Sequence, residues 1–191
     1  MHQGSIILST VSLTNELQQI LQLQQKNLPQ NISKTEAITQ GFVTVEHTFD
    51  LLKQMHDVEP AVIAKDGDKV IGYALVMTKE FGKAIPVLFP MFEMFEKVDY
   101  QNRKLAAHNY FVMGQVCIDK DYRGIGLFDK LYQKLKEQLS SKFDIMITEV
   151  ASRNARSIQA HKKSGLQTVH IYADAQEEVW EIMVWDLKSG N

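Results

Sequence analysis

The chain has only one cysteine, Cys117, among its 191 residues. A single thiol can form no internal disulfide, and a zinc site built from four cysteines is excluded. The six histidines are scattered along the chain, and none of them belongs to the HExxH pair that many zinc-dependent hydrolases carry. We therefore expect no metal centre.

An excess of basic residues is also lacking, because the formal net charge is −2. Nucleic-acid-binding proteins usually carry a strong basic excess, so no nucleic-acid partner is expected. No stretch approaches the ~20 apolar residues of a membrane span. The first ten residues lack the charged start and the long apolar core of a secretory signal. The sequence therefore predicts a soluble, cytoplasmic protein with no membrane partner.

What the chain does have is the composition of a globular protein. Apolar residues make up 45% of it, and the sequence shows no repeat and no low-complexity stretch. A chain of this length is long enough for one sizeable domain with a buried core. We therefore predict a single domain that spans residues 1–191.

Hydrophobic patterning predicts alternating strands and helices. Residues 61–77 are two strand-like runs around Asp66-Gly67-Asp68, which is a strong hairpin signal because the turn needs positive φ. The run from Tyr110 to Ile118 is too apolar to be half exposed, so it is expected to be a central strand. Further strands are predicted at 5–10, 144–150, 167–172 and 178–187, and helices at 13–25, 49–56 and 155–164, the last ended by Gly165.

A glycine loop follows the central strand and runs directly into another helical pattern. The stretch Tyr110 to Val150 is therefore one strand–helix–strand crossover with parallel strands, which implies a layered α/β domain. Within the loop, Arg123, Gly124, Ile125 and Gly126 precede the helix. The first N–H groups of a helix lack partners within it and carry the positive end of its dipole.

Two interpretations of this loop stay open. It is either a simple connector or a site for a diphosphate, with the glycines allowing close approach and Arg123 adding a cation. The P-loop pattern GxxxxGK[ST] does not occur. The dinucleotide pattern GxGxxG lacks its third glycine here.

An arginine followed by spaced glycines resembles the coenzyme A loop of the GNAT superfamily of N-acetyltransferases, whose pattern is [QR]-x-x-G-x-[GA]. Arg123 and Gly126 match this pattern. Phe128 stands where glycine or alanine is usual, and it either narrows the approach to the diphosphate or turns inward as a helix residue. A second signature of the family is similar to the stretch 153–166, where Asn154, Ser157, His161 and Gly165 fall on its positions. The order of the predicted elements also matches.

The resemblance implies a mixed α/β sheet of about seven strands flanked by helices, with the fourth and fifth strands splayed apart. These strands correspond to Tyr110–Ile118 and Asp144–Val150. The pantetheine arm of acetyl-CoA would be held by backbone groups of Val116, Cys117 and Ile118. The diphosphate would be held by backbone N–H groups of Arg123, Gly124, Ile125, Gly126, Leu127 and Phe128. Asn154, Ser157 and His161 would line the other wall.

The implied reaction transfers an acetyl group from acetyl-CoA to a primary amine of a small molecule or peptide, by direct attack in a ternary complex. His161 is the candidate acid, at a position where family members often carry tyrosine; the alternative is a histidine that packs on its helix face. Glu149 is the candidate base; the alternative is a carboxylate that caps or pairs with Arg153 or Arg156. Cys117 is expected to be a small buried apolar residue.

Two other functions remain open at this point. The first is a CoA-binding regulatory module with little or no catalysis. The second is a nucleotide-binding domain for ATP or NAD. Because paired protomers are frequent in this superfamily, a homodimer is one expected state.

Overall fold

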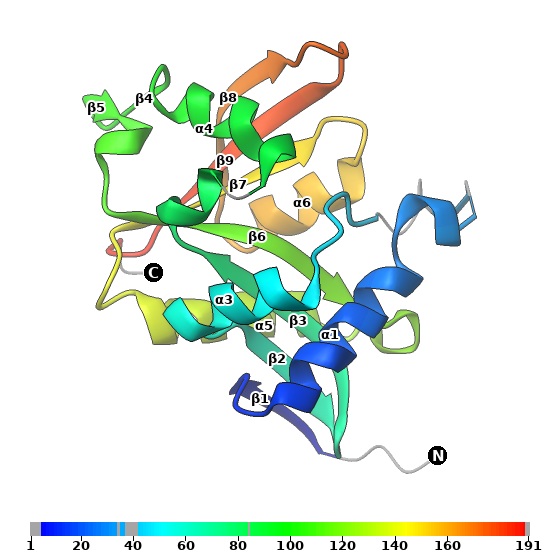
Figure 1. Ribbon diagram of the computed structural model, residues 1–191. Helices are drawn as coiled ribbons and strands as arrows, with labels where there is room; N and C mark the ends of the chain where they lie inside the picture. Colours follow the sequence, from blue (N-terminus) through cyan, green and yellow to red (C-terminus); the bar gives the residue numbers. More distant parts are fainter. Residues whose placement is uncertain (1–4, 34, 37–41, 84, 190–191) are drawn as a thin grey trace. The chain divides into compact units, whose positions relative to one another are not determined.

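The computed structural model describes residues 5–33, 35–36, 42–83 and 85–189. In the described parts, the strands form a seven-stranded sheet in the order β1-β2-β3-β6-β7-β9-β8 and a two-stranded sheet, β4-β5 (Figure 1). The larger sheet contains antiparallel and parallel pairs. The predicted mixed α/β sheet with flanking helices is confirmed. The chain divides into two compact units, which are described in turn.

Unit 1 comprises residues 1–76 and 113–138. Its strands β1 and β2 pair antiparallel, and β2 pairs antiparallel with β3. In Figure 1, α1 and α3 lie in front of these strands and α5 lies behind them. The bounds of its elements are β1 Ile6–Thr10, α1 Thr14–Lys26, α3 Phe49–Val58, β2 Val62–Asp66, β3 Lys69–Met77, β6 Tyr110–Ile118 and α5 Leu127–Leu139; β3, β6 and α5 each run partly into unit 2.

The hairpin between β2 and β3 is present where the Asp-Gly turn predicted it. Gly67 lies at the turn with φ +58°. This is the left-handed region, which glycine adopts without the steric cost that a Cβ imposes. The predicted hairpin is confirmed.

A chain of buried hydrogen bonds fixes the carboxyl-terminal half of β6 inside unit 1. The Tyr73 hydroxyl, on β3, donates to Gln115 Oε1 over 2.6 Å, and Gln115 Nε2 donates to the Val45 carbonyl oxygen over 2.7 Å. Both side chains are buried. Breaking either bond would leave a buried polar atom unpaired, so the network holds β6 in one position.

Helix α5 is held by an apolar stripe at helical spacing. Its buried residues include Leu127, Leu131, Leu135 and Leu139. A Cβ built on Gly72 of β3 would lie 3.5 Å from Leu131 Cδ1, so the helix packs closely on that strand. The stripe therefore sets where the first turn of α5 and the loop before it lie in unit 1.

Unit 2 comprises residues 77–112 and 139–191. The parallel ladder of β6 and β7 joins Tyr110–Val112 to Ile145–Ile147 and stops there, although both strands run on. Strand β7 pairs with β9 along its whole length, and β9 pairs with β8. The element bounds are α4 Phe89–Phe95, β4 Asp99–Tyr100, β5 Arg103–Lys104, β7 Ile145–Ala151, α6 Ala155–Lys163, β8 Gln167–Ala173 and β9 Val179–Asp186.

Helix α6 ends at Lys163, and the glycine that the sequence predicted as its terminator, Gly165, follows the C-cap Ser164. Gly165 has φ +100°, and a Cβ there would also lie 3.1 Å from Trp185 Nε1. Substitution at this position is therefore disfavoured by conformation and by space. In the described ranges, the helices are all too short or too polar to cross a bilayer.

We predict that Leu131→Ala lowers the free energy of unfolding by about 2–5 kcal/mol, because it leaves a cavity at a fully buried position. Leu13→Ala is the matched control. Leu13 is 56% exposed, so its loss should cost less than about 0.5 kcal/mol. Urea denaturation of the two variants measures the difference. Equal losses would contradict the packing described for α5.

Candidate functional site

The loop between β6 and α5 exposes its backbone at two left-handed glycines. Gly124 has φ +79° and Gly126 has φ +77°. A Cβ built on either glycine meets no atom within 4 Å. Both glycines and Ile125 between them are exposed. The side of the loop that side chains would otherwise fill is therefore open to a ligand.

The loop passes directly into the amino end of α5. The Gly126 carbonyl oxygen accepts the N–H of Lys130 over 3.3 Å, so the helical bonds begin there. The N–H groups of a first helical turn have no carbonyl acceptor within their own helix, and they carry the positive end of its dipole. An exposed glycine turn at such an end has the geometry and charge of an anion site.

Arg123 ties the loop to two other parts of unit 1. Its Nε donates to the Ile118 carbonyl oxygen over 3.1 Å, and one terminal nitrogen donates to Asn27 Oδ1 over 2.6 Å. The other terminal nitrogen forms an ion pair with Glu36 at 3.3 Å. The guanidinium therefore fixes the loop to the end of β6 and to the chain after α1.

Asp119 anchors the start of the loop. Its N–H donates to the Ile71 carbonyl oxygen over 2.8 Å. Its carboxylate accepts from Lys69 Nζ over 2.8 Å and from the Asp121 N–H over 3.2 Å. Burial alone would raise the pKa of Asp119, but these hydrogen bonds lower it below the ordinary value. The carboxylate therefore stays charged and holds the turn at neutral pH.

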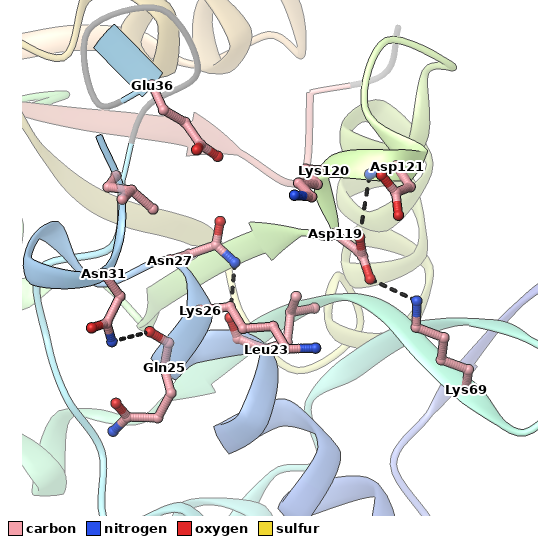
Figure 2. A pocket seen from close by; sticks show the side chains of 11 residues that line it. Leu23, Gln25, Lys26, Asn27, Asn31, Glu36, Lys69, Asp119, Lys120 and Asp121 are labelled. Carbon is pink, nitrogen blue, oxygen red and sulfur yellow. Dashed lines mark hydrogen bonds and ion pairs between the residues drawn. The ribbon is translucent and has the colours of Figure 1, made fainter. Parts of the chain in front are cut away.

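A polar pocket of about 580 Å³ lies beside this anchor within unit 1 (Figure 2). Residues from the end of α1, from the turn that follows it and from the start of the loop line it. Three lysines (Lys26, Lys69, Lys120) face three carboxylates (Glu36, Asp119, Asp121) in this lining. Positive and negative groups balance, so the pocket by itself selects neither anions nor cations.

The end of β6 contributes backbone rather than reactive side chains. Val116 and Ile118 are half-buried. Cys117 is 7% exposed, and burial raises the pKa of its thiol to about 12. A thiol in this state is not ionised near neutral pH and is a poor nucleophile. Cys117 is thus the small buried residue that the sequence predicted.

The Phe128 side chain packs against the next turn of α5. Its ring stacks on the Tyr132 ring, with centroids 4.5 Å apart and an angle of 15° between the planes. Of the two alternatives that the sequence left open, this geometry fits the one in which Phe128 acts as a helix residue. No atom of Phe128 lies within 4 Å of a Cβ built on Gly124 or Gly126.

In unit 2, Asn154 and Ser157 organise the first turn of α6. Asn154 Oδ1 accepts the Ser157 N–H over 3.3 Å, so Asn154 is the N-cap. Its own N–H donates to the Ala151 carbonyl oxygen over 2.7 Å. These bonds satisfy backbone groups at the helix start. They give Asn154 a structural role whether or not it also contacts a ligand.

His161 is buried one turn further along α6, with 1% of its surface exposed. Its Nδ1 lies 2.7 Å from the Ser157 carbonyl oxygen. A carbonyl oxygen only accepts, so Nδ1 carries the proton. Burial lowers the pKa of His161 from 6.5 to about 4, against the effect of this hydrogen bond. The ring is therefore neutral at pH 7, and its ring proton is engaged by the backbone.

Glu149 has a different environment on β7. The Tyr172 hydroxyl donates to Glu149 Oε1 over 2.5 Å. Burial raises the pKa of Glu149 from 4.5 to about 7, the bond from Tyr172 lowers it in part, and the charge of Asp174 raises it. Arg153, one of the partners that the sequence suggested for Glu149, forms an ion pair with Glu178. Glu149 therefore gains and loses its proton near neutral pH, as a general base must.

The structure thus groups the predicted residues within units. In unit 1, residues 116–128 run without a break from the end of β6, through the loop, into the first turn of α5. In unit 2, Asn154, Ser157 and His161 share the start and one face of α6, and Glu149 lies on β7. Sequence reasoning missed Tyr172, because nothing local indicates which strand lies within reach of β7. In the described part of the chain, no group of three or more acidic, histidine or cysteine side chains is arranged to hold a metal ion.

Comparison with known proteins decides the family. A sequence profile of the acetyltransferase (GNAT) family matches residues 18–166, which is most of the chain. The chain belongs to the GNAT acetyltransferase family. Comparison with curated protein sequences finds no significant match.

Solved structures share the fold of this GNAT protein. One is a putative acetyltransferase from Salmonella typhimurium with its cofactor acetyl-CoA, at 13% identity and TM-score 0.63 over 98% of this chain and 96% of that chain. Another is a ribosomal-protein-alanine N-acetyltransferase from Brucella melitensis, at 13% identity and TM-score 0.62 over 94% and 99%. The NatC complex bound to Gag peptide and CoA matches at 13% identity and TM-score 0.61 over 95% and 98%. At this identity the likeness shows the fold.

We predict that Glu149→Gln changes how stability depends on pH. A carboxyl whose pKa is raised from 4.5 to about 7 on folding binds more protons in the folded state between those values. Its contribution to stability therefore falls as pH rises from about 4.5 to about 7 and is constant above. Relative to the wild type, the variant should gain stability across this window.

Urea denaturation of wild type and variant at pH 5, 6, 7 and 8 measures this difference. The wild type serves as the reference because the titration of His161 changes stability in the opposite direction. The pKa of His161 is lowered from 6.5 to about 4, so its contribution to stability rises with pH in that range. Parallel stability curves for the two proteins would show that the carboxyl of Glu149 has an ordinary pKa.

Proposed function

We propose that this GNAT protein is an N-acetyltransferase that transfers the acetyl group of acetyl-CoA to a primary amine of a small molecule or peptide. Transfer occurs by direct attack within a ternary complex. The observation that carries the proposal is the open glycine loop at the amino end of α5, where Gly124 and Gly126 expose backbone to an approaching ligand. Family membership supports the same chemistry.

The residues present fit coenzyme A. The diphosphate is assigned to the backbone N–H groups of Arg123 to Phe128, because that stretch is open and lies at a positive helix end. Backbone groups of Val116 to Ile118 are assigned to the pantetheine arm. The guanidinium of Arg123 already contacts Ile118 and Asn27, so its first role is to hold the loop in shape.

Unit 2 holds the other residues that the resemblance to the family implies. Asn154 and Ser157 at the start of α6 are assigned to coenzyme A on the resemblance to the family signature. Bound acetyl-CoA would supply a thioester whose carbonyl carbon is open to attack. Glu149 is the proposed base: a carboxyl with a pKa of about 7 takes a proton from an ammonium and leaves the amine neutral.

His161 is a weaker candidate for the acid than the sequence suggested. A neutral imidazole whose proton is held by the Ser157 carbonyl has none ready to donate at pH 7. Thiols ionise near pH ~8.5, so a departing thiolate needs no strong acid. We therefore assign His161 to packing and orientation at the end of α6, and leave proton transfer to Glu149.

The acceptor is proposed to be a primary amine, with a peptide or protein N-terminus as the first class to test. Structures with this fold include a ribosomal-protein-alanine N-acetyltransferase and a complex bound to a peptide and CoA. Those substrates belong to those proteins, and they support the choice of test compounds. A cytoplasmic location, a single domain and a homodimer stay predictions.

A CoA-binding regulatory module is the second candidate function, because the predicted acid His161 is buried and neutral. Turnover separates the two. The protein is incubated with acetyl-CoA and a panel of amines and short peptides, and released CoA thiol is followed spectrophotometrically. Amine-dependent release in the wild type, lost in Glu149→Gln, is expected. Binding without release for every acceptor would favour the module.

We predict that Gly126→Ala weakens binding of acetyl-CoA by about tenfold or more. The methyl group would project from the open side of the loop, and positive φ would no longer be adopted without strain. Gly67→Ala is the matched control, because Gly67 also has positive φ and open space around its Cβ position but lies in the β2–β3 hairpin. Isothermal titration calorimetry measures both affinities. A similar small loss in both variants would argue against the loop as the diphosphate site.

A further inference from the structure

The hydrogen bond between Tyr172 and Glu149 joins two strands that are not neighbours. Strand β9 lies between β7 and β8 in the sheet order. Glu149 pairs with Ile182 of β9, and Tyr172 pairs with Trp180 of β9. The phenol and the carboxylate therefore reach across β9 to meet, with 2.5 Å between Tyr172 Oη and Glu149 Oε1.

The surroundings of this pair act on Glu149 in opposite directions. Asp174, after β8, is a second carboxylate whose charge acts on both Glu149 and Tyr172. Trp180 Nε1 donates to Asp174 Oδ2 over 2.9 Å, and such bonds lower the pKa of Asp174 and keep it charged. The His170 ring stacks on Tyr172 with centroids 6.3 Å apart. Burial and the charge of Asp174 thus disfavour ionisation of Glu149, whereas the hydrogen bond from the Tyr172 phenol favours it.

Tyr172 remains a hydrogen-bond donor over the whole working pH range. Burial and the hydrogen bond to Glu149 raise the pKa of Tyr172 above its ordinary value of 10.0, so the hydroxyl keeps its proton. A phenol that stays protonated always donates to the carboxylate. Hydrogen bonds to an ionised carboxylate favour that form over the neutral acid.

We propose that Tyr172 is a positioning residue for the base: its hydroxyl donates to Glu149 Oε1, fixes the carboxylate in place, and leaves Oε2 to accept the proton of the amine. This inference rests on the proposed function. The inference adds to that function a second residue, Tyr172, which lies on a different strand and acts through Glu149. Tyr172→Phe should therefore alter when Glu149 is ionised as well as how well it is held.

The test measures Glu149 directly and through catalysis. Side-chain carboxyl signals of ¹³C-labelled glutamate are titrated by NMR in the wild type and in Tyr172→Phe, with Glu149→Gln identifying the resonance. In Tyr172→Phe the pKa of Glu149 should rise by about one unit, since a hydrogen-bond donor to the charged form is lost. The acidic limb of the kcat/KM profile should move to higher pH by the same amount. Activity below the limb should fall about tenfold.

Tyr122→Phe is the matched control. The Tyr122 hydroxyl donates to Asp66 Oδ2 over 2.7 Å in unit 1, so the variant removes a phenol–carboxylate bond elsewhere. It should leave the titration of Glu149 and the position of the limb in place. A shift of similar size in this control would overturn the inference, because the effect would not depend on Tyr172.

The remaining outcomes separate the inference from the proposed function. An unshifted Glu149 resonance or an unshifted limb in Tyr172→Phe overturns the positioning role alone, provided that the wild type releases CoA thiol. Full activity of Glu149→Gln overturns the role of Glu149 and of Tyr172 together, and leaves acetyl transfer standing. Absence of thiol release from the wild type overturns the proposed function itself.

Discussion

The proposed binding of coenzyme A depends on a short stretch of exposed backbone between β6 and α5. Two glycines with positive φ shape the turn before α5, and hydrogen bonds and an ion pair anchor the residues that precede them. Asp119 holds its start to Lys69, and Arg123 holds its middle to Ile118 and Asn27. An exposed glycine turn at the positive end of a helix has the geometry and charge of an anion site.

In unit 2, the pKa values of the two candidate proton carriers, Glu149 and His161, are shifted in opposite directions. Burial acts on both, but with opposite consequences, because it disfavours the charged form of each. Glu149 is pushed toward a pKa of about 7, where it exchanges protons, whereas His161 is pushed to about 4, where it stays neutral. The bond from Tyr172 moderates the first shift. The same physical effect therefore favours Glu149 as the proposed base and disfavours His161 as the proposed acid.

Much of the fold could be predicted from local sequence. The Asp-Gly pair around Gly67 indicates a hairpin, the apolar run Tyr110–Ile118 indicates a central strand, and Gly165 indicates a helix end; each needs only a few neighbouring residues to be recognised. The glycine loop was visible for the same reason. Tyr172 was not, because its partner is fixed by the sheet order β7-β9-β8, and a strand pattern does not state its neighbours. The contact of Arg123 with Asn27 spans most of unit 1 in sequence, so no motif contains it. The state of His161 depends on burial by the whole unit, which sequence spacing does not reveal.

Amide hydrogen exchange on the wild-type protein, with and without saturating acetyl-CoA, tests the central claim most directly. Exchange of the amides from Arg123 to Phe128 should slow markedly when the coenzyme is bound, because each amide that holds the diphosphate is shielded. The amides of the hairpin around Gly67 should exchange as before. Unchanged exchange in the loop while the coenzyme is bound would contradict the account, since the diphosphate would then lie elsewhere.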